Sequence, residues 1–222
     1  MKKVFVLVIA ACAYFSISAQ RFDIGANLMM GLPMGDQMIG DQSEQYKGAP
    51  GFGIGGGIEA NFWFNDAINI GLEAGFISFG EQANALAIFP GAAFNSTATG
   101  IPIIVKSQYY FLDDAIRPFA GIGVGYLITS RSAELNLTGD KINWDQNGLL
   151  ISPRAGVMYQ LTEALAVNLC VQYNLVMNSI DGELELTYDY ADGTSETENI
   201  PSKMDATNYL GINIGVVYTL FD

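Results

Sequence analysis

Side chains able to carry out covalent or metal chemistry are sparse in this sequence. The 222 residues include no histidine, which excludes Ser–His and Cys–His nucleophilic pairs and histidine-ligated metal sites. Cys170 falls on the polar side of an alternating segment, where a small interior residue is the simplest interpretation. The glycine-rich segment 51–57 lacks the Lys-Ser/Thr ending of a phosphate-binding loop. We therefore expect a protein that is not an enzyme, with no catalytic residue and no cofactor.

Carboxylates gather in one segment, 178–207. A divalent cation could bind them, because Ca²⁺ takes several oxygen ligands, but their spacing matches no calcium loop. A solvated acidic loop is the interpretation that the sequence favours, and no metal site is assigned. The charged residues are Asp181, Glu183, Glu185, Asp189, Asp192, Glu196, Glu198 and Asp205, against Lys203.

Residues 1–19 have the order of a secretory signal peptide: a positive start, a short apolar run, and small residues before a cleavage site between Ala19 and Gln20. Lipid attachment at Cys12 is the alternative, disfavoured because the apolar core before it is unusually short. Cleavage leaves one domain, 20–222, with 8 basic and 23 acidic residues and a net charge of −15. So acidic a chain repels polyanions, and we expect no nucleic-acid partner.

Apolar residues alternate with small or polar residues through most of this domain. Half of the whole sequence is hydrophobic and only 15% is charged. Even so, no apolar run after the signal peptide reaches about 18 residues, the length that a membrane-spanning helix needs. Alternation over about ten residues between turns is instead the pattern of transmembrane β-strands. Eight such segments are predicted, at 21–31, 52–64, 68–79, 100–112, 117–130, 149–161, 165–177 and 208–221.

The connections between these segments alternate strictly in length. Short links and long links in turn are typical of an outer-membrane barrel, with short periplasmic turns and long extracellular loops. The sequence therefore predicts an all-β fold, an eight-stranded antiparallel up-and-down transmembrane β-barrel. Within the last two long links, apolar residues recur at every second position next to a Gly-Asp or an Asp-Gly pair. We therefore expect these links to form hairpins that continue above the membrane. The short links are 65–67, 113–116 and 162–164, and the long ones are 32–51, 80–99, 131–148 and 178–207.

A soluble barrel with an apolar interior would show the same alternation. The composition of the polar face therefore distinguishes a soluble barrel from a membrane barrel. Facing water, it should be rich in charged residues and threonine. Here it is mostly glycine, asparagine and glutamine. Glycine suits a crowded interior, because an eight-stranded barrel is barely wide enough for its own side chains. The polar face is therefore predicted to line the lumen and the apolar face to meet lipid.

Four charged residues on the inward face are predicted to lie at similar depth. Keeping both faces in register across the turn at 65–67 pairs residue 64 with 68, which places Glu59 opposite Glu73. Two adjacent buried carboxylates repel and need compensation. Lys106 and Arg154 are the inward-facing cations at that depth, so we predict one charge cluster that closes the lumen.

Aromatic residues gather on the apolar face near the short turns. Such residues form the aromatic girdle at a membrane interface, here the periplasmic one. The predicted girdle consists of Phe22, Phe62, Phe64, Tyr109, Phe111, Tyr159 and Tyr218.

Two stretches carry a resemblance to a known family. Residues 100–111, followed by 117–126, resemble the central hairpin of the small outer-membrane β-barrel proteins of Bacteroidetes, the PorT-like group, which is related in architecture to the OmpA and OmpX barrels. The ending 215–221 resembles the signal read by the barrel-insertion machinery, although Asp222 follows the terminal aromatic residue. The resemblance implies outer-membrane lipids and the insertion machinery as partners, and an internal salt-bridge network like that of OmpA-type barrels. It names no extracellular ligand.

Two classes of function fit these features. The first is a non-enzymatic surface protein whose loops serve recognition, adhesion or envelope integrity. The second is a narrow conduit, or an accessory for transport or secretion across the outer membrane. A lumen blocked by side chains favours the first class, whereas a conducting lumen would favour the second.

Overall fold

The computed structural model describes residues 21–34, 51–85, 93–135, 141–145, 147–178, 182–189, 194–202 and 208–221. The predicted signal peptide and its cleavage site lie outside these residues. Within the described residues, no helix is long and apolar enough to span a membrane.

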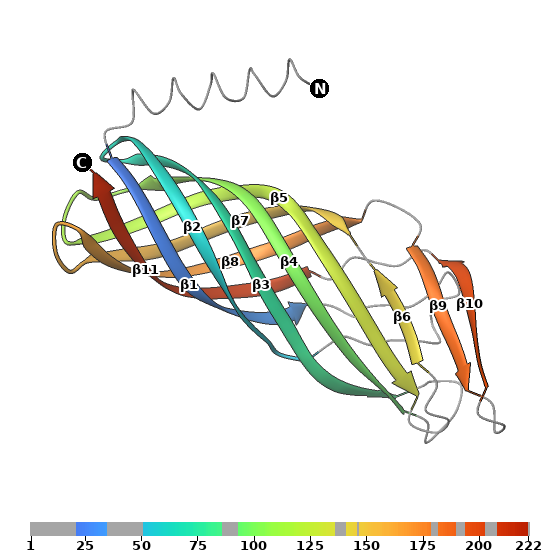
Figure 1. Cartoon of the computed structure of the whole chain (residues 1–222). Helices are drawn as coiled ribbons and strands as arrows, with labels where there is room; N and C mark the ends of the chain where they lie inside the picture. The colour runs from blue at the N-terminus through green and yellow to red at the C-terminus, as the bar shows by residue number, and fades with distance from the viewer. Residues whose placement is uncertain are drawn as a thin grey trace, which may run out of the picture.

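Eight antiparallel strands form a closed barrel (Figure 1), as the sequence predicted. Neighbours along the chain pair with one another, and the first strand also pairs with the last, so the sheet has no open edge around the barrel. Closure satisfies the backbone polar groups that an open edge would expose to lipid. The strands are β1 (Arg21–Met34), β2 (Gly53–Asn65), β3 (Ile68–Ala85), β4 (Ala93–Tyr110), β5 (Ile116–Leu135), β7 (Gly148–Gln160), β8 (Leu165–Asn178) and β11 (Asn208–Phe221).

Three further strands extend the sheet on one side of the barrel, at the end of the long loops (Figure 1). β6 (Lys141–Asp145) folds back on the end of β5, and β9 (Gly182–Asp189) forms a hairpin with β10 (Ser195–Ser202). The predicted hairpins are therefore present, although their tips lie outside the described residues. In addition, β6 pairs with β9, which joins the two hairpins into one projecting sheet. We call β6, β9, β10 and residues 130–135 of β5 the extension.

Exposure to solvent alternates along each barrel strand, and the residues predicted to face outward are the exposed ones. Outward residues are apolar and exposed, such as Leu28 at 64% and Ile58 at 68%. Their inward neighbours are buried, small or polar. Apolar side chains exposed in this density on every strand belong against lipid, because water would disfavour them strongly.

The structure differs from the prediction at the strand ends. β3, β4 and β5 extend beyond the predicted bounds of 68–79, 100–112 and 117–130, since these strands keep pairing past the length that a membrane requires. β4 also ends at Tyr110, before its predicted end.

The predicted pairing of residue 64 with 68 is wrong. A bulge at Phe64 lets Asn65 pair with Ile68 instead, while the predicted register holds further along the two strands. The Asn65 side chain explains the shift: its Oδ1 accepts hydrogen bonds from the backbone N–H groups of Ala67 (2.9 Å) and Ile68 (2.8 Å) and so closes the turn.

Candidate functional site: the barrel lumen

The four predicted lumen charges come together in the barrel interior. Glu59 of β2 lies directly opposite Glu73 of β3 in the strand register. Lys106 comes from β4 and Arg154 from β7. All four side chains are buried, with at most 6% of each residue exposed.

Each carboxylate has a cation at contact distance. The Lys106 ammonium group is paired with Glu59 and lies 3.5 Å from Glu73 Oε2. Arg154 donates to the same Glu73 oxygen at 2.8 Å. Asn168 Nδ2 completes the cluster with a hydrogen bond of 3.1 Å to Glu59 Oε1. Two negative and two positive charges balance, which offsets the cost of burying each one.

Glycines on neighbouring strands give these long side chains their room. A Cβ on Gly25 would lie 2.8 Å from the Glu59 side chain, and a Cβ on Gly123 would lie 3.1 Å from the Arg154 guanidinium group. The inward glycines therefore leave the space that the charged side chains occupy.

Two buried apolar clusters accompany the charges in the lumen, and neither was predicted from the sequence. The inward parity of these apolar residues along their strands was a signal in the sequence, but the inward face was predicted to be mostly glycine, asparagine and glutamine. With the charge cluster, they place buried side chains in the lumen toward both ends of the barrel. Toward the long loops the cluster contains Ile77, Phe79, Ala98, Ile104, Leu127, Leu150, Val176 and Tyr209. Toward the short turns it contains Trp63, Tyr110, Phe119, Met158, Ala166, Cys170 and Val217.

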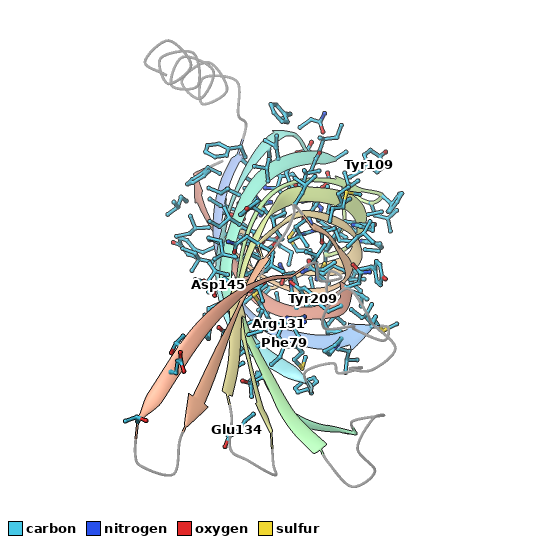
Figure 2. The ribbon with its side chains drawn as sticks, turned by 90° about the vertical axis from the view of Figure 1, so that its right-hand side faces the viewer. Phe79, Tyr109, Arg131, Glu134, Asp145 and Tyr209 are labelled. Atoms are coloured by element: carbon cyan, nitrogen blue, oxygen red, sulfur yellow. The ribbon has the colours of Figure 1, made fainter. Side chains whose placement is uncertain are left out.

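An aromatic pair spans the lumen toward the long loops. Phe79 of β3 and Tyr209 of β11 meet edge to face, with ring centroids 5.5 Å apart (Figure 2). Gly31 and Gly53 make room for the Phe79 ring, since a Cβ on either would lie within 2.8 Å of it. These strands are separated by β1 and β2 in the sheet, so the contact crosses the barrel.

A second polar group, also not predicted, lies near the short turns. Asp23 of β1 accepts hydrogen bonds from Trp63 Nε1 (2.7 Å) and from the Thr219 hydroxyl (2.8 Å), which ties the first strand to the last. The Arg117 guanidinium group lies 5.0 Å from the ring centroid of Trp63 and 5.3 Å from that of Tyr110. These contacts hold the aromatic side chains together at the short-turn end of the lumen.

The model of one protein family, described as the outer membrane protein beta-barrel domain, matches residues 5–219. The chain belongs to this family. Outer membrane protein OprG from Pseudomonas aeruginosa has a similar structure, with 18% identity, a TM-score of 0.62, and coverage of 92% of this chain and 98% of that chain. A major outer membrane protein from Thermus thermophilus is 12% identical with a TM-score of 0.57, covering 89% of this chain and 99% of that one. Comparison with curated proteins gives no match.

Membership in this family establishes an outer-membrane β-barrel, and the two structural likenesses show the fold alone. Contact of the exposed apolar surface with outer-membrane lipid stays a prediction. The more specific resemblance to the Bacteroidetes PorT-like group goes beyond what family membership establishes.

The predicted aromatic girdle lies on the outer surface at the short-turn end. Tyr109, Phe111, Tyr159 and Tyr218 are 46–58% exposed, whereas the three phenylalanines of β1 and β2 are half-buried. Neighbouring members contact one another: the rings of Phe22 and Phe62 lie 4.5 Å apart, and those of Tyr109 and Phe111 lie 5.3 Å apart. Phe111 follows the last residue of β4. Contact of these rings with the periplasmic interface stays a prediction.

Groups that could hold a metal ion are absent among the described residues. No three Asp, Glu or Cys side chains among them are grouped to hold a metal ion. Cys170 is a free, buried thiol that contributes to the apolar cluster near the short turns. The side chains of the acidic hairpin β9–β10 are only partly described, so the cation-site alternative at 178–207 stays untested. What the lumen geometry shows is buried packing and balanced charge; closure of the lumen stays a prediction.

Proposed function

We propose that this chain is a non-enzymatic outer-membrane protein whose surface hairpins serve recognition, adhesion or envelope integrity. The observation that carries the proposal is the contrast between a lumen filled with side chains and a sheet that continues beyond the barrel as the extension. A conduit would need an open lumen, whereas a surface protein needs a rigid platform outside the membrane. The specific relationship to the PorT-like group, export through a signal peptide cleaved after Ala19, and insertion by the barrel machinery are parts of the same proposal.

The outer face of β5 supports a position of the extension in water. Val124, Tyr126 and Ile128 point outward and are 43–47% exposed. Beyond Ile128 the outward residues become polar: Ser130 and Glu134 are both exposed. Their register partners on β6, Asp145 and Lys141, are polar as well. This change supports a position of the extension in water, and we propose that the outer membrane boundary lies close to Ile128.

Protease treatment of intact cells tests the orientation. We expect cleavage within 131–148 or 178–207, and none at the turns 65–67, 113–116 and 162–164, because only loops outside the membrane on the cell surface are accessible. Mass spectrometry of the released peptides gives the positions. Cleavage at Asn65-Asp66 in intact cells, with the envelope shown to be sealed, would contradict the orientation.

Removal of the β9–β10 hairpin tests the surface function. Replacing residues 182–202 by a short Gly-Ser linker should leave the barrel folded, because its eight strands pair independently of this hairpin. We expect normal heat-modifiable migration in SDS gels together with reduced cell adhesion or increased detergent sensitivity.

Planar-bilayer recordings of the full chain test the alternative function. Steady single-channel conductance would contradict the closed lumen and favour the conduit.

A further inference from the structure

One face of the extension is polar and the other is apolar. The register from β5 through β6 and β9 to β10 aligns residues of one kind across the strands. The polar face continues the outer surface of the barrel, and Ser130, Glu134 and Asp145 are exposed on it. An amphipathic sheet of this kind is normally completed by a second layer over its apolar face. Strand alternation places on that apolar face Ile142, Trp144, Leu184, Leu186, Tyr188 and Ile200.

The described part of the chain supplies no second layer for the extension. Among the described strands, β10 packs against β9 alone, and β9 packs against β10 and β6. β6 in turn packs against β5 and β9. The extension therefore projects from the barrel as a single layer of strands (Figure 2), with its apolar face available to a partner.

Acidic residues border this apolar face along its outermost strand. Glu196 and Glu198 are the register partners of Tyr188 and Leu186, so they share the face with the apolar residues. Both lie on β10, the last strand in the order of the sheet. The cation Arg131 lies on the same face where the extension joins the barrel, and it is 5% exposed. The outer part of the face therefore carries negative charge, which attracts a cationic partner.

The dimensions of the apolar face suit one α-helix. β9 and β10 each have eight residues, which at about 3.3 Å per residue gives a length of about 26 Å. A helix of about 17 residues has the same length, at about 1.5 Å per residue. The three strands β6, β9 and β10, about 4.8 Å apart, span about 14 Å. This width is slightly more than the diameter of a helix, about 10 Å.

We propose that the apolar face of the extension binds a cationic amphipathic helix. The apolar side of the helix covers the face formed by β6 and β9, and its basic residues lie beside Glu196 and Glu198 on β10. Polyanions and anionic lipid surfaces are disfavoured as partners, because the same carboxylates repel them. This binding rests on the proposed surface function, for which it names the chemistry of the partner.

A synthetic peptide of leucine and lysine, about 18 residues long and amphipathic as a helix, is the probe. Fluorescence anisotropy of the labelled peptide measures its binding to the full chain in nanodiscs of zwitterionic lipid, with empty nanodiscs as the reference for partition into lipid. We expect saturable binding that weakens with added salt. A counterpart with glutamine in place of each lysine should bind at least about ten-fold more weakly. No binding above the empty-nanodisc level, or equal binding of the two peptides, would overturn the proposal.

Two matched pairs of carboxylates locate the binding face. Glu196→Gln with Glu198→Gln should weaken binding of the lysine peptide about five- to ten-fold, because both residues lie on the apolar face. Glu183→Gln with Glu185→Gln removes the same charge from the opposite face of β9, and its effect should stay below about two-fold. Equal losses in the two variants would mean that the peptide responds to net charge alone and would overturn the proposal.

A single substitution tests the apolar contact. Leu186→Ser should weaken binding about ten-fold, whereas Thr187→Ser, one residue along on the polar face, should leave it unchanged. Equal binding by the two folded variants would overturn the proposal, and the carboxylate pairs test it independently should Leu186→Ser fail to fold.

Binding by the purified protein and the phenotype of cells are separate readouts. Failure of the peptide to bind, together with adhesion that depends on the β9–β10 hairpin, would overturn the helix as partner and leave the surface function in place. Binding of the peptide, together with unchanged adhesion and detergent sensitivity after removal of the hairpin, would contradict the surface function alone.

Discussion

Replacing Lys106 by methionine should destabilise the folded barrel by about 3–5 kcal/mol, the cost typical of removing one partner from a buried ion pair. Methionine is an unbranched side chain only one heavy atom shorter than lysine, so the loss is mainly one of charge. Lys106 is the cation paired with Glu59, while Arg154 remains on Glu73 after the change. Glu59 would then keep only the hydrogen bond from Asn168. Urea unfolding in lipid vesicles measures the effect.

A second substitution identifies which carboxylate is left without compensation. Adding Glu59→Gln to the Lys106→Met variant should recover most of the lost stability, because it removes the uncompensated charge and keeps the side-chain shape. Adding Glu73→Gln instead should recover little, since this breaks the pair with Arg154. Equal recovery by both additions would show that the four groups act as a diffuse, hydrated set and not as specific pairs.

The register of the barrel was predictable because strand geometry constrains it tightly. Side chains alternate with a period of two, and a turn of few residues leaves few registers that keep both faces correct. Glu59 and Glu73 could therefore be placed opposite each other even though the turn between them contains an unpredicted bulge. The bulge depends on the Asn65 side chain, and it changes the pairing only beside the turn.

Contacts across the barrel were harder to predict. Tyr209 and Phe79 meet because of the diameter and stagger of the closed barrel. Local sequence patterns do not predict these two quantities. The same holds for Arg117 and Trp63, whose strands β5 and β2 are separated in the sheet by β4 and β3. Likewise, the pairing of β6 with β9 joins two loops whose hairpins were each recognisable alone. Sequence patterns thus predicted which residues face inward and which charged residues meet, but not the aromatic contacts across the lumen.

Close approach of neighbouring strands should make one lumen glycine irreplaceable even by alanine. A Cβ at Gly55 would overlap sterically with the Phe76 carbonyl oxygen and would lie 2.7 Å from Ile77 Cα. Both atoms belong to the backbone of β3, so no side-chain rotation can relieve the overlap. Because overpacking against side chains already costs about 1–3 kcal/mol, we expect Gly55→Ala to cost more than about 3 kcal/mol or to prevent folding.

The adjacent residue provides a matched control for this prediction. Gly56 points to the outer face, and the nearest atom to a Cβ there is the Asn27 carbonyl oxygen at 3.3 Å. Gly56→Ala should change stability by less than about 1 kcal/mol, because the gain from a less flexible unfolded chain offsets the small displacement needed. The folded fraction in SDS gels without heating, and the urea midpoint in vesicles, measure both variants. Equal stability of the two would mean that β2 and β3 are farther apart at Gly55 than this geometry requires, whereas loss of folding in Gly55→Ala alone would show that backbone contact there sets the barrel wall.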